Sequence, residues 1–533
     1  MSSLRRWLGL VVIGIAVSLI IVDTTVVNVA IPAIVDDLGV SSTQVQWIQE
    51  SYTLVFAALL IAFGTLGDRI GRRALLLIGV GVFAAASVAA GLAPDGATLI
   101  AARVAQGVGG AMVLPGTMSL INAGFRGRDR TIAFAVWGSI IGGMAAVGPL
   151  LGGWLITDFS WRWAFGVNVP FGLLVLAAAV FTIEESRSER PERFDPVGAA
   201  LGVVAAGLLV FALIEGRSLG WIAVNERVTI GDWTWPWALS PTPVLLGLAL
   251  LALVGFLLWE RRRDRAGKPT LFPLHLFSLT SFRNGNLVAM IVSLGELGLL
   301  FVLPMWMQNV LGYDALQAGF ALVSLAVGSF LATGMVSGLS RRMSAVGMLR
   351  LGVALELAGV LALGLVLSVD TGAWLIAGLL FVYGLGIGLA SSQVTNVVLA
   401  DVPVDHSGQA SGTQSTARQI GSALGVAILG TVLFTSLAAD LDSRLGDLPA
   451  AERDPVVTAV TGSAGAAIPG LRAAPATTAA GDAAAESFTA ASSYAAYTAA
   501  AFLAVALAAS ATLRARRDDE GAVDHEPATA TPA

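Results

Sequence analysis

Long apolar runs separated by short polar segments recur along the whole chain. Crossing the hydrocarbon core of a bilayer takes roughly 20 mostly apolar residues, so each run of that length predicts a membrane-spanning helix. The first block has runs near residues 8–32, 45–66, 74–93, 97–122, 131–156 and 162–183. The later runs lie near residues 195–216, 242–259, 285–311, 315–338, 347–368, 372–399, 409–435 and 491–513. The pattern predicts an all-α polytopic membrane protein with about fourteen spans.

Composition excludes several classes of protein. The chain has 533 residues, of which 56% are hydrophobic and 13% charged, against about 25% charged in an average soluble domain. It contains no Cys, which removes disulfides, thiolate metal sites and cysteine nucleophiles. The net charge of -5 gives no reason to expect nucleic acid as a partner. The first run carries Asp23 and lacks a small-residue cleavage site before Pro32, so we interpret it as a retained span.

Basic residues gather in alternate loops. With the N-terminus inside, the inside loops hold Arg69, Arg72, Arg73, Arg126, Arg128, Arg130, Arg187, Arg190, Arg193, Arg261, Arg262, Arg263, Arg265, Lys268, Arg341, Arg342, Arg514, Arg516 and Arg517. The outside loops hold Arg162, Arg217, Arg227, Arg444, Arg453 and Arg472. This asymmetry follows the positive-inside rule. It predicts an even number of spans with both termini in the cytoplasm.

A glycine-rich basic segment occurs twice. Gly64-Thr-Leu-Gly-Asp-Arg-Ile-Gly-Arg-Arg73 follows the second span, and the weaker Gly334-Met-Val-Ser-Gly-Leu-Ser-Arg-Arg342 follows the tenth. Their equivalent places predict two repeated halves. We expect a division into a six-helix half (1–190), two linker helices (191–282), a second six-helix half (283–515) with a long extracytoplasmic loop (436–490), and a disordered cytoplasmic tail (516–533).

The first of these segments resembles the signature loop of the major facilitator superfamily. The matching positions are Gly64, Gly67, Asp68, Arg69, Gly71, Arg72 and Arg73. Glycines permit a tight turn, and Asp68 can sit near the N-terminus of the next helix. A purely topogenic basic loop is the alternative reading. The resemblance implies a conformational latch that does not bind substrate.

Further motifs resemble the fourteen-span drug:proton antiporter branch of that superfamily. They include the first-span segment from Asp23 through Asn28 to Pro32, and Arg103-Val-Ala-Gln106 in the fourth span. The fifth span contains Gly148, Pro149, Gly152 and Gly153, which resemble the motif associated with antiporters. Ordinary close helix packing explains small residues of this spacing equally well. Together the motifs imply the major facilitator fold, with two six-helix halves plus two extra central helices.

Ionisable residues inside the spans are the candidate chemical groups, because charges are costly in lipid. Counting 1.5 Å per helical residue places Asp23, Glu50 and Arg103 in the outer half of the membrane, and we expect them to form one proton-coupling cluster. Arginine keeps its proton at ordinary pH, so Arg103 would act by biasing a carboxylate.

The second half carries its own charges. We expect Glu296 and Glu356, with Asn28 and Gln106 of the first half, to bind substrate, and Glu296 to face the cavity. Arg418 lies in a segment typical of the branch and is expected to pair structurally with a carboxylate or with helix carbonyls. The thirteenth span carries no carboxylate, unlike that of some multidrug members, which argues against broad recognition of divalent cationic dyes.

The energy source is inferred from what the sequence lacks. No P-loop occurs, since the only lysine, Lys268, stands in Gly-Lys-Pro. We therefore expect a monomeric proton-coupled antiporter, not an enzyme, that exports lipophilic and cationic drugs across the bacterial cytoplasmic membrane. It would need no cofactor or metal, and its partners would be the bilayer, protons and a small-molecule substrate. Dedicated export of an endogenous antibiotic or lipid is the alternative, and a non-transporting sensor fits less well.

Overall fold

Long helices follow the predicted apolar runs. The computed structural model describes residues 3–125, 127–187, 195–224, 229–230, 233–268, 270–271, 274–340, 342–402 and 407–513. The first half contains α1 (Ser3–Leu38), α2 (Ser42–Ile70), α3 (Arg72–Gly91), α4 (Gly96–Gly124), α5 (Gly127–Asp158), α6 (Trp163–Gly166) and α7 (Asn168–Thr182). The linker pair is α8 (Pro196–Leu219) and α9 (Pro241–Arg265), followed by the short η1 (Leu274–Ser278). The second half contains α10 (Thr280–Asn309), α11 (Ala315–Leu339), α12 (Ala345–Val366), α13 (Ala373–Leu399), α14 (Ser407–Arg444) and α17 (Thr478–Ser510).

Polar caps explain where several of these helices begin. Ser41 accepts a hydrogen bond from the Gln44 backbone, and the Gln44 side chain accepts one from the Ser41 backbone, which forms a capping box for α2. Asp314 and Gln317 form the same arrangement at the start of α11. Asp95 caps α4 through the Thr98 backbone N–H. These N-terminal caps stabilise the first turn of α2, α4 and α11.

The number of spans is partly settled. Among the described residues, twelve helices are long and apolar enough to cross a membrane. α2 and α5, with 29 and 32 residues, are long enough to be further spans. They are not among the twelve, and the structure does not describe the side chains at several of their positions. Fourteen spans therefore remains a prediction. The tail at 516–533 and the basic positions Arg126, Arg190, Arg193, Arg341, Arg514, Arg516 and Arg517 also lie outside the described residues.

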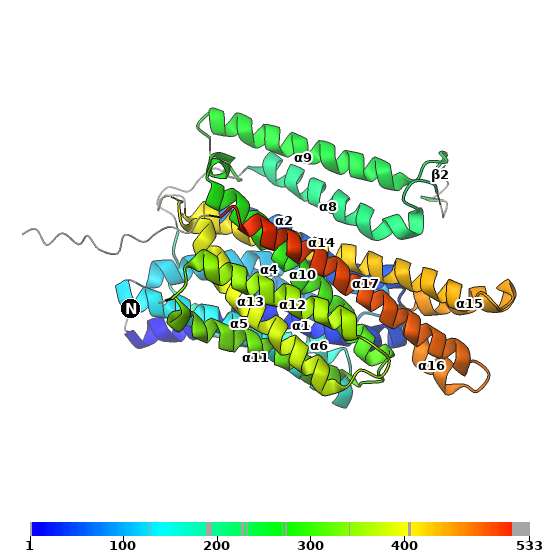
Figure 1. The fold of residues 1–533 in the computed structure, drawn as a ribbon. Coiled ribbons are helices and arrows are strands. Elements are labelled where there is room, and N and C mark those ends of the chain that lie inside the picture. Colours follow the sequence, from blue (N-terminus) through cyan, green and yellow to red (C-terminus); the bar gives the residue numbers. More distant parts are fainter. Residues whose placement is uncertain are drawn as a thin grey trace, which may run out of the picture.

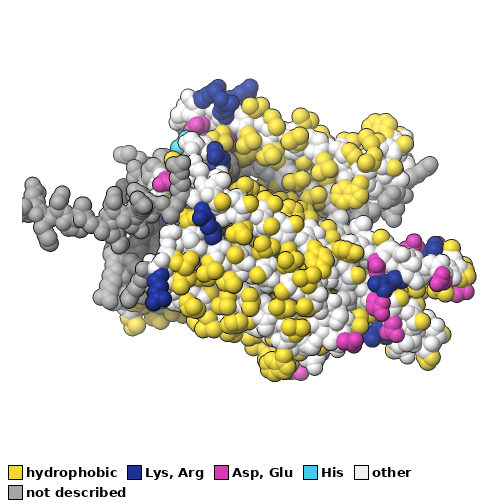
Figure 2. Space-filling view, viewed as in Figure 1, with side chains coloured by type: hydrophobic (Ala, Val, Ile, Leu, Met, Phe, Trp, Pro, Cys, Tyr) yellow, Lys and Arg dark blue, Asp and Glu magenta, His cyan; other side chains and the backbone are white. Residues whose placement is uncertain are grey.

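The halves meet along a seam. α5 packs against α11, and α2 packs against α14. The linker helix α8 lies beside both α2 and α14, and α9 packs on its outer side (Figure 1). Apolar side chains cover the middle of the bundle, whereas charged side chains gather toward its two ends (Figure 2). This distribution is the one expected for a protein surrounded by lipid.

Both long loops contain regular structure. In the linker loop, Thr229–Ile230 (β1) and Trp233–Thr234 (β2) form a short antiparallel pair outside the helical bundle, and the predicted all-helical membrane fold is confirmed. The segment 436–490 is largely helical: α14 continues to Arg444, α17 begins at Thr478, and α15 (Ala450–Gly462) and α16 (Ala467–Ala473) lie between them. The apolar pattern ends near Asp440, but a 2.6 Å ion pair one turn apart, from Asp440 to Arg444, supports the helix beyond it.

Candidate functional site

A charged pair is buried inside the first half. Arg103 Nη1 on α4 lies 2.5 Å from Asp23 Oδ2 on α1, and both side chains are fully buried. Charge-assisted hydrogen bonds of this kind are short and strong. A buried ion pair stays favourable only if further hydrogen bonds replace the lost hydration. The surroundings of the pair should therefore be polar.

Three helices, α3, α4 and α7, supply that polar surrounding. Asp23 Oδ1 accepts hydrogen bonds from Gln106 Nε2 at 3.0 Å and from Asn168 Nδ2 at 2.8 Å. Both amides also donate to Ser87 Oγ, at 2.9 Å and 3.3 Å. Gln106, expected to bind substrate, thus belongs to the Asp23 network. Sequence reasoning missed Ser87 and Asn168, although a polar residue within an apolar run was the signal that could have found them.

Arg103 is held by more than its carboxylate partner. Its Nε donates to the Ile48 carbonyl of α2 at 3.0 Å, and its Nη1 donates to Gln106 Oε1 at 3.0 Å. The guanidinium carbon lies 4.3 Å from the centre of the Tyr52 ring, a cation–π contact. Arginine does not give up its proton, so the group that can change charge in this network is the Asp23 carboxyl.

Glu50 does not join the pair. Its side chain is completely buried, and neither carboxyl oxygen has a hydrogen-bond partner among the described residues. Helix geometry explains the difference from the expected three-residue cluster. The Tyr52 ring contacts Arg103, whereas Glu50, two residues earlier, is rotated from it by about 200° around the helix. Asp23, Glu50 and Arg103 share a depth in the membrane, but the Glu50 side chain does not project toward the other two.

The second half holds a looser group of charges. Arg418 Nη2 on α14 lies 3.6 Å from Glu296 Oε2 on α10 and donates to Ser391 Oγ at 3.3 Å. Glu356 on α12 is completely buried without a hydrogen-bond partner among the described residues, and it interacts electrostatically with Glu296 and Arg418. Arg418 is about one third exposed and Glu296 15%, so this pair is the more accessible. Its accessibility suits a group that meets a substrate.

Asn28 lies apart from both charged groups. It is buried on α1, and its amide nitrogen reaches only the Thr24 carbonyl one turn earlier, at 3.5 Å. Its side-chain oxygen has no partner in the described part of the chain. The structure therefore shows no contact that joins Asn28 to Glu296 or Glu356.

The signature loop forms a tight junction between α2 and α3. Gly71 adopts a φ of 121°, which favours glycine. Glu185, just after α7, accepts hydrogen bonds from the backbone N–H groups of Arg73 at 3.0 Å and Ala74 at 3.1 Å. The Arg73 side chain in turn donates to the Ile183 carbonyl at 3.1 Å. Sequence reasoning missed Glu185; the Asp68 side chain is outside the described set.

The glycine motif of α5 lies at the seam. A Cβ on Gly152 would stand 2.9 Å from Val26 Cγ1 on α1, and one on Gly153 would stand 2.7 Å from Leu316 Cα on α11. Thr157 Oγ1 accepts a hydrogen bond from the Leu316 backbone at 3.3 Å. Gln308 of α10 donates to the Val29 carbonyl of α1 at 3.1 Å. The contacts made by Leu316 and Gln308 hold the halves together at the end of the bundle where α1 passes to α2, here called the α1–α2 end.

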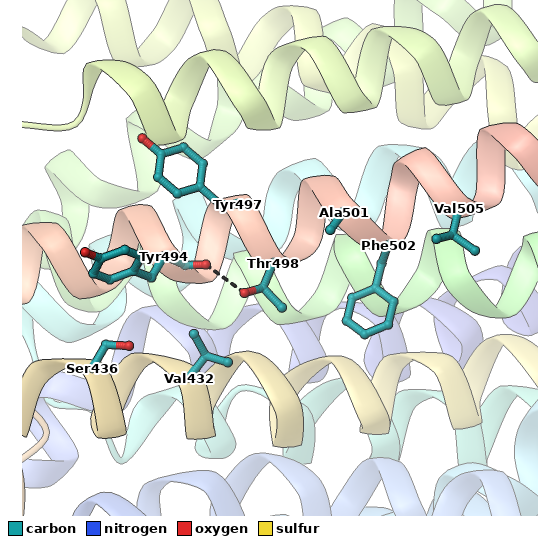
Figure 3. A pocket seen from close by; sticks show the side chains of 8 residues that line it. All are labelled: Val432, Ser436, Tyr494, Tyr497, Thr498, Ala501, Phe502 and Val505. Carbon is teal, nitrogen blue, oxygen red and sulfur yellow. Dashed lines mark hydrogen bonds between the residues drawn. The ribbon is translucent and has the colours of Figure 1, made fainter. Parts of the chain in front are cut away.

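The described cavities lie elsewhere. One of about 620 Å³ lies between α14 and α17 and is lined by Val432, Ser436, Tyr494, Tyr497, Thr498, Ala501, Phe502 and Val505 (Figure 3). Tyr494 and Val505 are more than half exposed, so this groove opens on the outside of the bundle. Another of about 350 Å³ lies between α2 and α8. None of the buried charged groups lines either cavity, and no cluster in the described residues could hold a metal ion.

Two helical halves that meet along a seam, with charged groups buried in each, define a membrane transporter of the secondary type. The chain belongs to the Major Facilitator Superfamily, which it matches over residues 13–214 and 192–426. It is therefore a transporter of small molecules and not an enzyme. A solved bacterial homologue of the human lysosomal transporter Spinster, inward-facing and unoccupied, shares the fold with a TM-score of 0.64 and 17% identity, covering 96% of this chain and 98% of that one.

Several curated relatives cover most of the chain. The multidrug resistance protein Stp of Mycobacterium tuberculosis is 34% identical over 439 residues, which is 82% of this chain and 78% of that protein. The puromycin resistance protein pur8 of Streptomyces alboniger is 36% identical over 462 residues, 86% of this chain and 87% of that protein. A probable actinorhodin transporter of Streptomyces coelicolor is 35% identical over 454 residues, 83% of this chain and 75% of that protein.

Proposed function

We propose that this transporter exports lipophilic, cationic drug-like compounds from a bacterial cell in exchange for protons. The completely buried Asp23–Arg103 pair is the observation that carries the proposal. A charge pair inside a membrane bundle is expensive, and such groups mark ion or proton pathways. The names of Stp and pur8, given above, support export of toxic compounds as the task.

Coupling would arise from competition for carboxyl groups. Asp23 and Glu50 would take up and release protons, with Arg103 setting the charge state of Asp23. Glu296 and Glu356, beside Arg418, would meet the cationic substrate. When a carboxyl group accepts a proton, it no longer attracts a cation, so proton entry favours release of the drug. Rocking of the halves about the seam would expose these groups to each side in turn.

The orientation belongs to the same proposal. Both termini would lie in the cytoplasm of a bacterial inner-membrane protein that acts as a monomer. The α1–α2 end would then face outward, and the contacts there would close the outer side. α15 and α16 would project outside, where α14 and α17 extend beyond the rest of the second half (Figure 1).

Purified protein in liposomes tests the proposal. An inward-directed proton gradient should drive uphill export of ethidium, and collapse of the gradient by an uncoupler should abolish it. Export that persists without a proton gradient would contradict proton coupling. Similarity to the actinorhodin transporter favours a second candidate, export of an endogenous antibiotic. That candidate predicts transport of one such compound and none of ethidium.

A further inference from the structure

Three neighbouring polar side chains on α2 have unmet hydrogen-bonding capacity. Gln46, Gln49 and Glu50 are completely buried. The amide nitrogen and oxygen of both glutamines, and both carboxyl oxygens of Glu50, have no hydrogen-bond partner in the described part of the structure. Buried polar groups are almost always paired, so such a concentration of unpaired atoms within two turns requires an explanation.

The three residues share one side of the helix. They stand at positions i, i+3 and i+4, a spacing that places side chains next to each other on an α-helix. Tyr52, whose ring contacts Arg103, is rotated by about 200° from Glu50 but stands three residues after Gln49, so Gln49 is the member of the group nearest to Arg103. None of the three side chains hydrogen-bonds to Asp23 or Arg103.

Gln46 of this group faces the other half of the molecule. α2 packs against α14, and a Cβ on Gly430 of α14 would lie 3.1 Å from Gln46 Cδ. Gly430 thus leaves room for the Gln46 amide at the seam. Because the seam must open during alternating access, a ligand held by these side chains would gain or lose contacts as the halves move.

Charges on the surrounding helices are already engaged. Arg103 of α4 pairs with Asp23 of α1. Glu215 of α8 accepts a hydrogen bond from Trp47 Nε1 at 2.9 Å, and Arg418 of α14 pairs with Glu296. No described cation bonds to Glu50, so the empty site favours the neutral carboxyl group, and an entering cation would supply the partner that favours the ionised form.

We propose that Gln46, Gln49 and Glu50 form a binding site for the cationic head of an exported compound that also carries N–H donors. Glu50 would supply the negative charge, and the two amide oxygens would accept hydrogen bonds from the ligand. Charge-assisted hydrogen bonds in a dry site are the strong ones. This inference rests on the proposed export of cations and gives Glu50, proposed above to exchange protons, a second role as a carboxyl group for which proton and cation compete, in addition to Glu296 and Glu356.

Equilibrium binding to purified wild-type and variant protein in detergent, without a proton gradient, tests the site. Ethidium is the probe with N–H groups, and tetraphenylphosphonium is a cation without them. Glu50→Gln removes the charge at constant shape and should weaken both ligands about ten-fold or more. Gln46→Leu and Gln49→Leu should weaken ethidium more than tetraphenylphosphonium. Glu452→Gln, the same chemical change on exposed α15, should bind both ligands like wild type.

The outcomes separate this inference from the proposed function. If wild type binds neither cation, or if Glu50→Gln and both leucine variants bind ethidium like wild type, the site is wrong. If binding survives in Glu50→Gln while gradient-driven export is lost, the inference fails but proton coupling stands. If Glu50→Gln does not yield folded protein, the two leucine variants still decide, because they change neither charge nor the Asp23 network.

Discussion

Arg103 Nη1 and Asp23 Oδ2 lie 2.5 Å apart inside the first half, and neither side chain is exposed. The carboxylate receives two further amide donors, and the guanidinium reaches the α2 backbone. The pair therefore ties α1, α2, α4 and α7 together. Protonation of Asp23 would alter contacts on all these helices. Binding of a single proton could therefore change how the helices pack.

Removing the arginine should destabilise the protein more than removing both charges. Arg103→Leu leaves Asp23 buried without a cation, and breaking a buried pair this way costs roughly 3–5 kcal/mol. The double variant Asp23→Asn with Arg103→Leu should recover much of that loss. Thermal unfolding of purified protein in detergent measures both. A double variant less stable than Arg103→Leu alone would show that the pair does not contribute through its charges.

The α2–α3 junction should tolerate no side chain at Gly71. A Cβ there would stand 2.6 Å from the Glu185 carboxylate, and the φ of 121° is itself unfavourable for alanine. Gly71→Ala should therefore reduce export strongly while the protein still inserts. Gly39→Ala is the control for a positive φ without a neighbouring side chain, because Gly39 has a φ of 61° with nothing within 4 Å. Equal losses in the two variants would assign the effect to backbone strain and not to Glu185.

The seam should open at the α1–α2 end when Gly153 gains a side chain. Gly153→Val places methyl groups against Leu316, whose Cα is already 2.7 Å from an added Cβ. We expect spin labels on the C-terminal end of α5 and the N-terminal end of α11 to move apart, as measured by double electron–electron resonance. Gly378→Ala and Gly378→Val, at a position with nothing within 4 Å, serve as controls. Unchanged distances in Gly153→Val would show that Gly153 is not needed to close the α1–α2 end.

Orientation can be measured with single cysteines, because the chain contains none. Thr458→Cys on α15 and Ala266→Cys after α9 are both at exposed positions. In intact cells an impermeant thiol reagent should label the first and not the second. The reverse pattern would invert the proposed topology.

The sequence predicted the depth of the charged residues in the membrane better than the side of the helix on which each one lies. Span lengths and the helical rise bring Asp23 and Arg103 to one level, and the structure pairs them. The same reasoning grouped Glu50 with them, because it could not tell which side of α2 faces α4. Tertiary packing sets that rotation, and no apolar stripe marks it in a helix buried on several sides. Asn168 escaped notice because one polar residue hardly changes the hydropathy of an apolar run.

Helix ends outside the bilayer were also hard to predict. A hydropathy pattern reports where lipid contact stops, whereas α14 continues in a polar setting. Its Arg444 pairs with Asp440 one turn earlier and with Glu486 of α17 at 2.5 Å. The pair with Glu486 joins segments far apart in the chain, so it depends on the folded arrangement and leaves no local signal.

Proton release on substrate binding tests the central claim most directly. Purified protein in weakly buffered detergent solution is mixed with a saturating exported cation, and the pH of the solution is followed. We predict that wild type and Glu452→Gln release protons, whereas Asp23→Asn, which keeps the shape of the side chain but cannot titrate, releases measurably fewer. Release from Asp23→Asn equal to that of wild type, with export intact, would contradict the role of Asp23 in coupling.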